Sequence, residues 1–417
     1  MNTPAVIMLY AIPGFFVLMG LELAVAAWRG HARYRLNDAI NSIGLGILSQ
    51  LTGVFAKTLT IGIYAWFVQR VALFDLPAYS VWVWAGALVG YDFCYYWLHR
   101  AGHEVNVLWA AHVVHHQSEC YNLSTALRQT SSGALVGWIF YLPLAVAGVP
   151  VQVFAVVALV DLLYQFWIHT GEIGSLGGFD RVFASPSNHR VHHAVNERYL
   201  DRNYGGILML WDHLFGTFQP ELATEPPVYG TRAPLRSWNP LWANLEVYVA
   251  TLRDALRAKR WRDRLQIWWR HPGWRPSDVA ARDPKPAFDI HRPAYDPPMS
   301  SAMRVYGALQ FLLLLGMSLQ FLIQQARMPG PLLLGYFAYM AAALTVLGWV
   351  LEGRRLAWLA EMARLAGSAG AVLILGRWFG MPVGEGARVA LAVLAVAAML
   401  LLGFARRPDR KPRLAVA

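Results

Sequence analysis

Eight of the thirteen histidines in this 417-residue chain fall in three short groups. The groups are His99 and His103; His112, His115 and His116; and His189, His192 and His193. Spacings of three and four residues place side chains on one face of a helix, with Cβ atoms about 5–6 Å apart. Each group can therefore offer two or three imidazole rings to a common centre.

The number of rings limits the kind of metal site. Imidazole suits zinc, iron, copper and nickel, but a structural zinc ion closes with four ligands and a catalytic one with three ligands and a water. Eight clustered histidines are too many for one ion and fit two ions, each with open positions. Activation of O2 needs a redox-active metal with a vacant position, so we expect two iron ions.

Further candidate residues flank the three groups. His169, in the segment YQFWIHTGE, is a ninth candidate ligand because the expected topology returns it to the same face as the others. Metal-bound imidazoles usually donate their second N–H to a carboxylate or a carbonyl. Glu104 directly follows His103, so we expect Glu104 to have a catalytic role. Asp92 and Asp212 are further candidates for orienting a ring, although each acid could equally be a helix cap or a solvated charge. His213 is expected to be structural or to support a ligand.

The composition places these histidines beside a membrane. The chain is 56% hydrophobic and 15% charged, whereas an ordinary soluble protein carries about 25% charged residues. Its eighteen Trp and eighteen Tyr are side chains that collect at membrane–water interfaces. The net charge of +11 lies in short clusters next to apolar runs, which favours contact with anionic lipid over nucleic acid. Cys94 and Cys120 form no CxxC pair, so no disulfide framework or cysteine zinc site is expected.

Apolar runs of about 20 residues predict membrane-spanning helices. The expected runs are 7–28, 39–68 with a possible break near Gly53, 79–98, a hairpin of 133–147 and 151–167, 303–323, 332–351, 356–375 and 389–404. We expect an all-α, polytopic membrane bundle in four parts. These are N-terminal helices (1–78), a histidine-rich catalytic domain (79–220), an interfacial segment with a linker (221–300), and C-terminal helices with a basic tail (301–417).

Basic residues predict which side of the membrane carries the histidines. With the N-terminus outside, the loop at 29–35, Arg354, Arg355 and the tail fall on the inner side, as the positive-inside rule requires. The basic residues of the tail are Arg406, Arg407, Arg410, Lys411 and Arg413. The same path places all three histidine groups and His169 on the inner side. The Ala-, Gly-, Arg- and Leu-rich composition is typical of a bacterial protein, so we expect a bacterial inner membrane. The basic residues predict that the active site faces the cytoplasm.

The polar segment between the two sets of spans contains one amphipathic stretch. Residues 239–269 interleave Trp and Leu with Arg and Lys, which predicts a helix that lies on an anionic membrane surface or packs on the catalytic domain. Residues 276–298 are Pro-rich and predict an extended linker.

The chain resembles the fatty acid hydroxylase/sterol desaturase superfamily. The resemblance rests on the order of the three histidine groups and on the segments around them, from Tyr91 to Phe218. It implies a di-iron centre held by the eight histidines, with His169 joining them, and a need for Glu104. It also implies a lipid substrate such as an ether lipid, O2, and tetrahydrobiopterin or another electron donor. Ser187-Asn188-His189 departs from the usual Ser-His-His, but no motif histidine is changed.

These observations predict an O2-dependent lipid monooxygenase. Hydroxylation of a carbon next to an ether oxygen would give a hemiacetal, which breaks into an aldehyde and a glycerol. A sterol or fatty-acyl hydroxylase or desaturase would use the same site. A zinc-dependent membrane hydrolase would need fewer ligands and a basic carboxylate such as Glu104, and a bis-histidine haem protein would leave the adjacent histidine pairs unexplained. The oligomeric state is not readable from the sequence.

Overall fold

The computed structural model describes residues 3–405, so the expected basic tail lies outside the described residues. The chain divides into two compact units. The bounds are Met1–Ser49, Gly53–Leu235 and Asn244–Ala294 for unit 1, and Gln50–Thr52, Arg236–Ala243 and Tyr295–Ala417 for unit 2. Both units are mainly helical, which confirms the expected fold class. The division into four parts stays a prediction.

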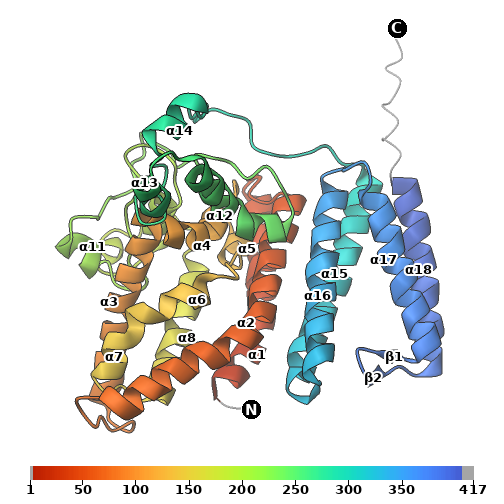
Figure 1. Ribbon diagram of the computed structural model, residues 1–417, viewed down its shortest axis with the longest axis horizontal. Helices are drawn as coiled ribbons and strands as arrows, with labels where there is room; N and C mark the ends of the chain where they lie inside the picture. The colour runs from red at the N-terminus through yellow and green to blue at the C-terminus, as the bar shows by residue number, and fades with distance from the viewer. Residues whose placement is uncertain (1–2, 406–417) are drawn as a thin grey trace. The chain divides into compact units, whose positions relative to one another are not determined.

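Long apolar helices form the lower part of unit 1 (Figure 1). They are α1 (Thr3–Trp28), α2 (Leu36–Val71), α3 (Val81–Glu104) and α8 (Val151–Trp167), with the broken segment α6 (Gly133–Gly137), η1 (Trp138–Tyr141) and α7 (Leu142–Val146). The helix α2 runs through Gly53 without the break that the sequence allowed. Aromatic rings hold these helices together, since Tyr91 of α3 stacks on Tyr141 with ring centroids 4.6 Å apart.

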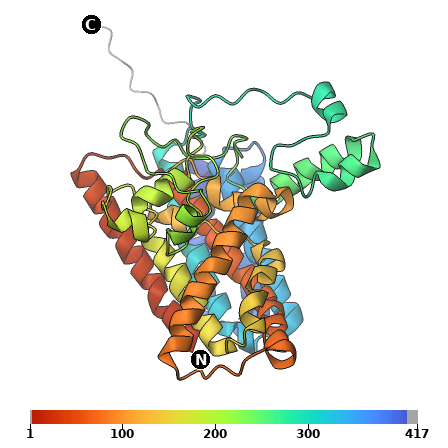
Figure 2. The same cartoon turned by 90° about the vertical axis from the view of Figure 1, so that its left-hand side faces the viewer.

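Six helices in the described part of the chain are long and apolar enough to cross a membrane. They are Ala11–Trp28, Leu36–Ala56, Ser301–Arg327, Gly330–Leu351, Ala357–Leu375 and Glu385–Ala405. The chain is therefore an integral membrane protein. The six do not include α3, which was expected as a span, because Trp and Tyr fill much of it and it ends in the polar residues 99–104. Figure 2 shows α3, in orange, rising from the turn at residues 72–80 toward the polar end of unit 1.

Gly148 closes the expected hairpin between α7 and α8. Its φ is +87°, and a Cβ there would overlap the carbonyl oxygen of Phe74. The turn is held from both sides, because Leu73 N–H donates to Val146 O at 2.7 Å and the Tyr64 hydroxyl donates to Val149 O at 3.1 Å. Only glycine combines this backbone angle with this close approach.

Gly148→Ala is expected to destabilise unit 1 by more than about 1 kcal/mol, because alanine has the wrong backbone preference and its Cβ meets the Phe74 carbonyl. Gly62→Ala is the matched control, since no atom lies within 4 Å of the position that a Cβ would take on this helical glycine. Thermal unfolding of both variants in detergent, followed by circular dichroism, would measure the difference. Equal midpoints for the two variants would contradict the account of the turn.

Short helices and loops build the polar end of unit 1. They are α4 (Asn106–His116), α5 (Leu123–Ala126), α9 (Phe179–Val182), α10 (Pro186–His192), α11 (Leu210–Leu214), α12 (Pro240–Arg257), α13 (Trp261–Gln266) and α14 (Ser277–Arg282). Most of α12 belongs to this unit.

The prediction of a single helix at 239–269 is wrong, because the helix is interrupted at residues 258–260 between α12 and α13. Polar groups from nearby segments bind the backbone there. The Arg264 guanidinium donates to Ala258 O at 2.9 Å, and Lys259 N–H donates to Asp278 at 3.1 Å. Asp278 and Arg282 pair four residues apart at 3.2 Å, which stabilises α14 inside the segment expected to be an extended linker.

The two interpretations of the amphipathic stretch apply to different faces of α12. One face packs on the catalytic part, where Asn106 donates to Thr251 at 3.1 Å and Ser132 lies 3.0 Å from the Tyr248 hydroxyl. Leu252 and Leu256 on the other face are 48% and 68% exposed. Contact of this exposed face with a membrane surface stays a prediction.

Unit 2 contains four long helices and a small hairpin. They are α15 (Ser301–Gln324), followed by η2 (Gln325–Arg327), α16 (Gly330–Leu351), α17 (Ala357–Leu375), β1 (Arg377–Trp378), β2 (Met381–Pro382) and α18 (Glu385–Ala405). In Figure 1 the four helices of this unit stand side by side, and the hairpin lies at their lower end. The two short strands pair antiparallel, with Trp378 opposite Met381.

Candidate metal centre

Four separate segments bring nine histidines together at the polar end of unit 1. The end of α3 carries the first group, and α4 follows after a single residue, Val105, so that it can turn back against α3. The segment after α8 supplies His169, and α10 with its C-terminal cap supplies the third group. All nine rings are buried except that of His112, which is half-buried.

The nine rings separate into two groups that could each hold an ion. Within a group, the candidate ligand nitrogens lie within 4.8 Å of one another. Group A contains His99, His103, His112, His116 and His192, and group B contains His115, His169, His189 and His193. The groups are adjacent, because the rings of His116 and His193 stack with centroids 4.3 Å apart. Two of the sequence motifs are therefore divided between the two groups.

Backbone carbonyls decide which nitrogen of four rings carries the proton. The Nδ1 atoms lie 2.7–2.9 Å from carbonyl oxygens: His99 from Tyr204, His115 from Arg128, His169 from Gln165, and His192 from Arg202. A carbonyl only accepts, so each ring donates through Nδ1–H. A neutral ring of this tautomer has a lone pair on Nε2. These four rings therefore present their Nε2 lone pairs to the centre.

The Nε2 atoms face one another in a way that a hydrogen bond does not explain. His115 Nε2 lies 3.1 Å from His169 Nε2, although both carry lone pairs. The buried Nε2 atoms of His99, His103 and His192 have no hydrogen-bond partner among the described residues. Lone pairs that converge in a buried site repel one another unless a cation lies between them. The donor set therefore fits a metal ion in each group.

The distances between the ring nitrogens show whether two rings can bind one ion. At a metal–nitrogen distance of about 2.1 Å, two ligands lie about 3.0 Å apart at a right angle and about 3.4 Å apart at the tetrahedral angle. The contacts between Nε2 atoms are 3.0 Å for His112 and His116, 3.1 Å for His115 and His169, 2.9 Å for His169 and His189, and 3.1 Å for His189 and His193. These neighbouring Nε2 atoms are therefore close enough for two rings to bind the same ion.

Burial keeps these rings in the neutral form that binds metals. It lowers the pKa of His115 to about 4, and the neighbouring Arg128 adds to the effect while a carbonyl hydrogen bond opposes it. The pKa values of His169 and His193 also lie well below the ordinary value, first because of burial and then because of neighbouring rings. Neutral imidazoles are therefore available as ligands at pH 7.

Two buried aspartates hold the loop that orients His99. Asp212 accepts hydrogen bonds from the backbone N–H groups of Tyr204 and Gly205, both at 2.8 Å, and thereby positions the Tyr204 carbonyl that His99 binds. Asp92 accepts from Ile207 N–H at 2.7 Å in the same loop. Both aspartates were candidates for orienting a ring. In the structure each one accepts hydrogen bonds from backbone N–H groups of this loop and does not contact an imidazole ring of the cluster.

Asp212→Asn is expected to lower activity by about 10- to 100-fold, as the loss of supporting hydrogen bonds around a metal ligand usually does. The amide keeps the size of the carboxylate, but its NH2 group meets a backbone N–H that needs an acceptor. Asp263→Asn on α13 is the control and should leave the rate unchanged. Iron analysis of both proteins would show whether the loss comes from the site, and an Asp212→Asn enzyme with full activity would refute this role.

Asp201 is the carboxylate that lies nearest a histidine of the cluster. Its Oδ1 lies 3.4 Å from His103 Nδ1, and its Oδ2 lies 3.3 Å from His271 Nε2. Burial would raise the pKa of Asp201, but His103 and His271 hold it below the ordinary value. From the sequence, Asp201 was one of several nearby polar residues that could orient a ligand, but it was not favoured, and His271 was given no role.

Glu104 does not contact a ring of the cluster among the described residues. Its carboxylate binds Arg100 Nε at 2.9 Å, and its side chain is 41% exposed. A catalytic role for Glu104 therefore stays a prediction. His213 lies outside both groups, where its ring stacks on Phe218 and its Nε2 lies 3.0 Å from Arg181 O.

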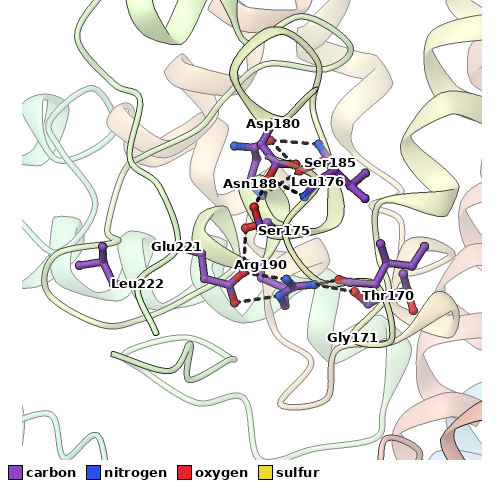
Figure 3. A network of polar contacts seen from close by, with 12 residues as sticks. Thr170, Gly171, Ser175, Leu176, Asp180, Ser185, Asn188, Arg190, Glu221 and Leu222 are labelled. Carbon is purple, nitrogen blue, oxygen red and sulfur yellow. Dashed lines mark hydrogen bonds and ion pairs between the residues drawn. The ribbon is translucent and has the colours of Figure 1, made fainter. Parts of the chain in front are cut away.

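An arginine ties the segment after His169 to the helix of the third histidine group. Figure 3 shows the Arg190 guanidinium between Glu221 and the backbone near Thr170. It donates to Glu221 at 2.7 Å and to Thr170 O at 3.1 Å. The start of α10 is fixed by a capping box in which Ser185 and Asn188 bind each other's backbone N–H groups. These contacts set the position of His169 relative to α10.

A cavity of about 330 Å³ adjoins both groups. It is lined by His99 and His112 of group A, by His115 of group B, and by Asp161 and Gln165 of α8. A second cavity of about 240 Å³ shares the lining residues Leu98 and Gly133 with the first and is mainly apolar. Its lining includes Trp138, together with Tyr64 and Phe154.

The sequence of the chain is similar to those of known proteins. The family model for fatty acid hydroxylase matches residues 84–217. Alkylglycerol monooxygenase of Homo sapiens is 36% identical over 85% of this chain and 80% of its own length, and that of Danio rerio is 37% identical over 85% and 79%. The chain belongs to the alkylglycerol monooxygenase family. The ornithine lipid hydroxylase OlsE of Rhizobium tropici is 30% identical over 31% of the chain and 40% of its own length. No solved structure matches.

Membership of this family confirms the expected enzyme class. The chain is an O2-dependent lipid monooxygenase of the membrane that uses iron, and it is related to fatty acid hydroxylases and sterol desaturases. The zinc hydrolase and the haem protein considered above are not favoured.

Proposed function

We propose that the enzyme hydroxylates the carbon next to the ether oxygen of an alkylglycerol lipid and so cleaves the ether bond. The observation that carries the proposal is the convergence of nine imidazole rings into two ligand groups whose Nε2 lone pairs face one another. The family relationship adds the substrate, since the relatives that match most of the chain are named alkylglycerol monooxygenases.

Groups A and B would each hold one iron ion, which supplies the redox chemistry that activates O2. The overall reaction takes O2, two electrons and two protons, and it gives water and a C–OH group in place of C–H. The resulting hemiacetal then breaks to an aldehyde and a glycerol. The electrons come from an external donor such as tetrahydrobiopterin or another reductant.

The residues of the chain would orient the ligands and keep water away. Backbone carbonyls of Tyr204, Arg128 and Gln165 fix the tautomers of three rings. Asp201 binds the outer nitrogen of His103. Burial of the rings removes bulk water from both groups, which prevents side reactions of the reduced site.

The two neighbouring cavities suit an amphipathic substrate. Asp161, Gln165 and the Tyr95 hydroxyl form a hydrogen-bonded chain at the wall of the first cavity, with contacts of 2.6 and 2.7 Å. These polar groups can bind glycerol hydroxyls. The apolar second cavity, lined by Trp138 and Phe154, can hold the alkyl chain. The ether bond would then lie near the rings of His99 and His112.

Metal analysis combined with product analysis tests the proposal. Purified protein loaded with iron is expected to contain two irons per chain and to convert a 1-O-alkylglycerol into glycerol and an aldehyde with one oxygen atom from ¹⁸O2. Tetrahydrobiopterin and a reduced flavoprotein would be compared as donors. An enzyme with one zinc and no iron, or one that desaturates the alkyl chain without releasing aldehyde, would refute it.

Ala158→Phe is expected to reduce kcat/KM for long-chain alkylglycerols by more than about tenfold, because an added ring in a packed cavity displaces its occupant. Ala158 lines the first cavity. Val160→Phe is the matched control, since Val160 lies on the same helix and is 43% exposed. Iron content should be equal in both variants, and unchanged kinetics in Ala158→Phe would remove this cavity from the substrate path.

We also propose that the enzyme lies in a bacterial inner membrane with groups A and B on the cytoplasmic side, where soluble reductants are available. The basic loop at residues 29–35 supports this orientation. In intact cells, Arg198→Cys should react with membrane-impermeant maleimide only after the cells are opened. Arg198 is suitable because its side chain is 58% exposed on the loop that follows the third histidine group.

A further inference from the structure

Unit 2 contains a cavity of its own, which is lined by no histidine. Its volume is about 720 Å³, and α15, α16, α17, α18 and the β1–β2 hairpin all contribute to its lining. Ligand pockets typically measure about 300–1,000 Å³. No step of the oxygenation uses this cavity.

A buried ion pair lies at the polar wall of this cavity. Arg364 donates to both oxygens of Glu361, through Nε at 2.7 Å and through Nη2 at 2.6 Å. The side chain of Glu361 is fully buried, and that of Arg364 is 8% exposed. Charged residues inside spans are costly and usually mark a functional site. Because the two charges cancel, the wall carries no net charge and does not favour an anionic ligand.

Hydrogen-bonding groups surround the ion pair. The Tyr306 hydroxyl donates to Glu361 at 2.5 Å, and Arg364 also donates to the Tyr339 hydroxyl at 2.9 Å. Gln310 accepts from Arg364 through Oε1 at 2.7 Å. The amide nitrogen of Gln310 has no hydrogen-bond partner among the described residues, and Gln310 lines the cavity. A ligand oxygen that accepts a hydrogen bond would therefore satisfy this donor.

Apart from Gln320 and Ser368, most of the remaining lining is apolar. Leu309 and Leu313 of α15 and Leu391, Ala398 and Leu401 of α18 form part of it. A wall of this kind suits a hydrocarbon chain, and the volume suits one chain better than a two-chain phospholipid with its head group.

We propose that this cavity binds an uncharged lipid with a single long chain, whose head-group oxygens lie at Gln310, Tyr339 and Arg364 and whose chain lies along α15 and α18. Both an alkyl- or acylglycerol and an isoprenoid quinone have this chemistry. The site would bind this lipid within unit 2, independently of the metal centre.

Photolabelling of the full-length protein in nanodiscs tests the proposal. A 1-O-alkylglycerol with a diazirine in its chain is expected to label peptides of α15 and α18. Ala398→Phe and Leu391→Trp, which fill the cavity, should reduce this labelling at least about tenfold, equivalent to about 1.4 kcal/mol. Leu400→Phe is the matched control on α18, because Leu400 is 71% exposed and does not line the cavity, so its labelling should be unchanged.

Competition identifies the source of the lipid. Excess unlabelled alkylglycerol or quinone should suppress the labelling, and the stronger competitor indicates the natural ligand. A fatty-acid probe of the same length, which is anionic, should label these peptides less. Equal labelling of all variants would indicate annular lipid only, and equal labelling by the anionic probe, or no suppression by either competitor, would likewise overturn the proposal. The assay runs equally with metal-free protein, so its outcome is separate from that of the oxygenase test.

Discussion

Replacing His169 by alanine is expected to lower the rate of lipid hydroxylation by more than about 100-fold. Removal of a residue that only supports a metal ligand typically costs about 10- to 100-fold, and loss of a ligand itself should cost more. The Nε2 atom of His169 lies 3.1 Å from that of His115 and 2.9 Å from that of His189, so this ring stands between two others of group B. Its removal leaves three rings in group B and all five in group A. Iron should therefore fall from about two ions per chain toward one.

His213→Ala is the matched control for this experiment. The ring of His213 is also in contact with an aromatic residue, since it stacks on Phe218, but it lies within the short helix α11, outside both groups, and binds Arg181 O. Iron content and activity should stay near those of the unchanged enzyme. Plasma emission spectrometry and Mössbauer spectroscopy would follow the metal directly. Full iron occupancy in His169→Ala, or equal losses in both variants, would contradict the assignment of group B.

Arg128→Met is expected to cost about 3–5 kcal/mol of local stability, the usual result of removing one partner from a buried charge network. The Arg128 side chain is among the largest fully buried ones. It donates to Val114 O and to Asn41, both at 2.7 Å, and to Gln117 at 3.3 Å. Methionine fills a similar volume but leaves these acceptors without a donor. Burial lowers the pKa of Arg128 to about 10, so the guanidinium is still charged at pH 7.

This change should also disturb the metal centre, because the Arg128 carbonyl accepts the Nδ1–H of His115 at 2.9 Å. Hydrogen exchange of peptides that cover residues 110–130 would measure the free energy of local opening. Arg198→Met is the control, since the Arg198 side chain is 58% exposed and its ion pair with Glu225 lies at the surface. That variant should differ by less than about 0.5 kcal/mol. If exchange in Arg128→Met matched the control, the buried network would not stabilise this segment.

Local pattern in the sequence was enough to identify the helices and the metal-binding residue types. Apolar runs depend only on the chemistry of neighbouring side chains, so the long helices of both units appear where those runs occur. The turn at Gly148 was also expected, because Gly and Pro restrict the backbone locally. The expectation failed at residues 258–260, where Arg264 and Asp278 bind the backbone and end a helix that the periodicity would have continued.

The spacing of the histidines determined that two metal ions are expected, but only the tertiary structure decided how the rings are shared. Two motifs are divided because adjacent rings on a helix, such as His115 and His116, point in directions about 100° apart and meet different partners. Which rings then meet depends on how α3, α4, α8 and α10 pack, and contacts between distant segments leave no spacing signal. For the same reason Asp201 and the carbonyls of Tyr204 and Arg128 could not be assigned from the sequence, since a backbone carbonyl is present at every residue and only the fold selects the ones that face a ring.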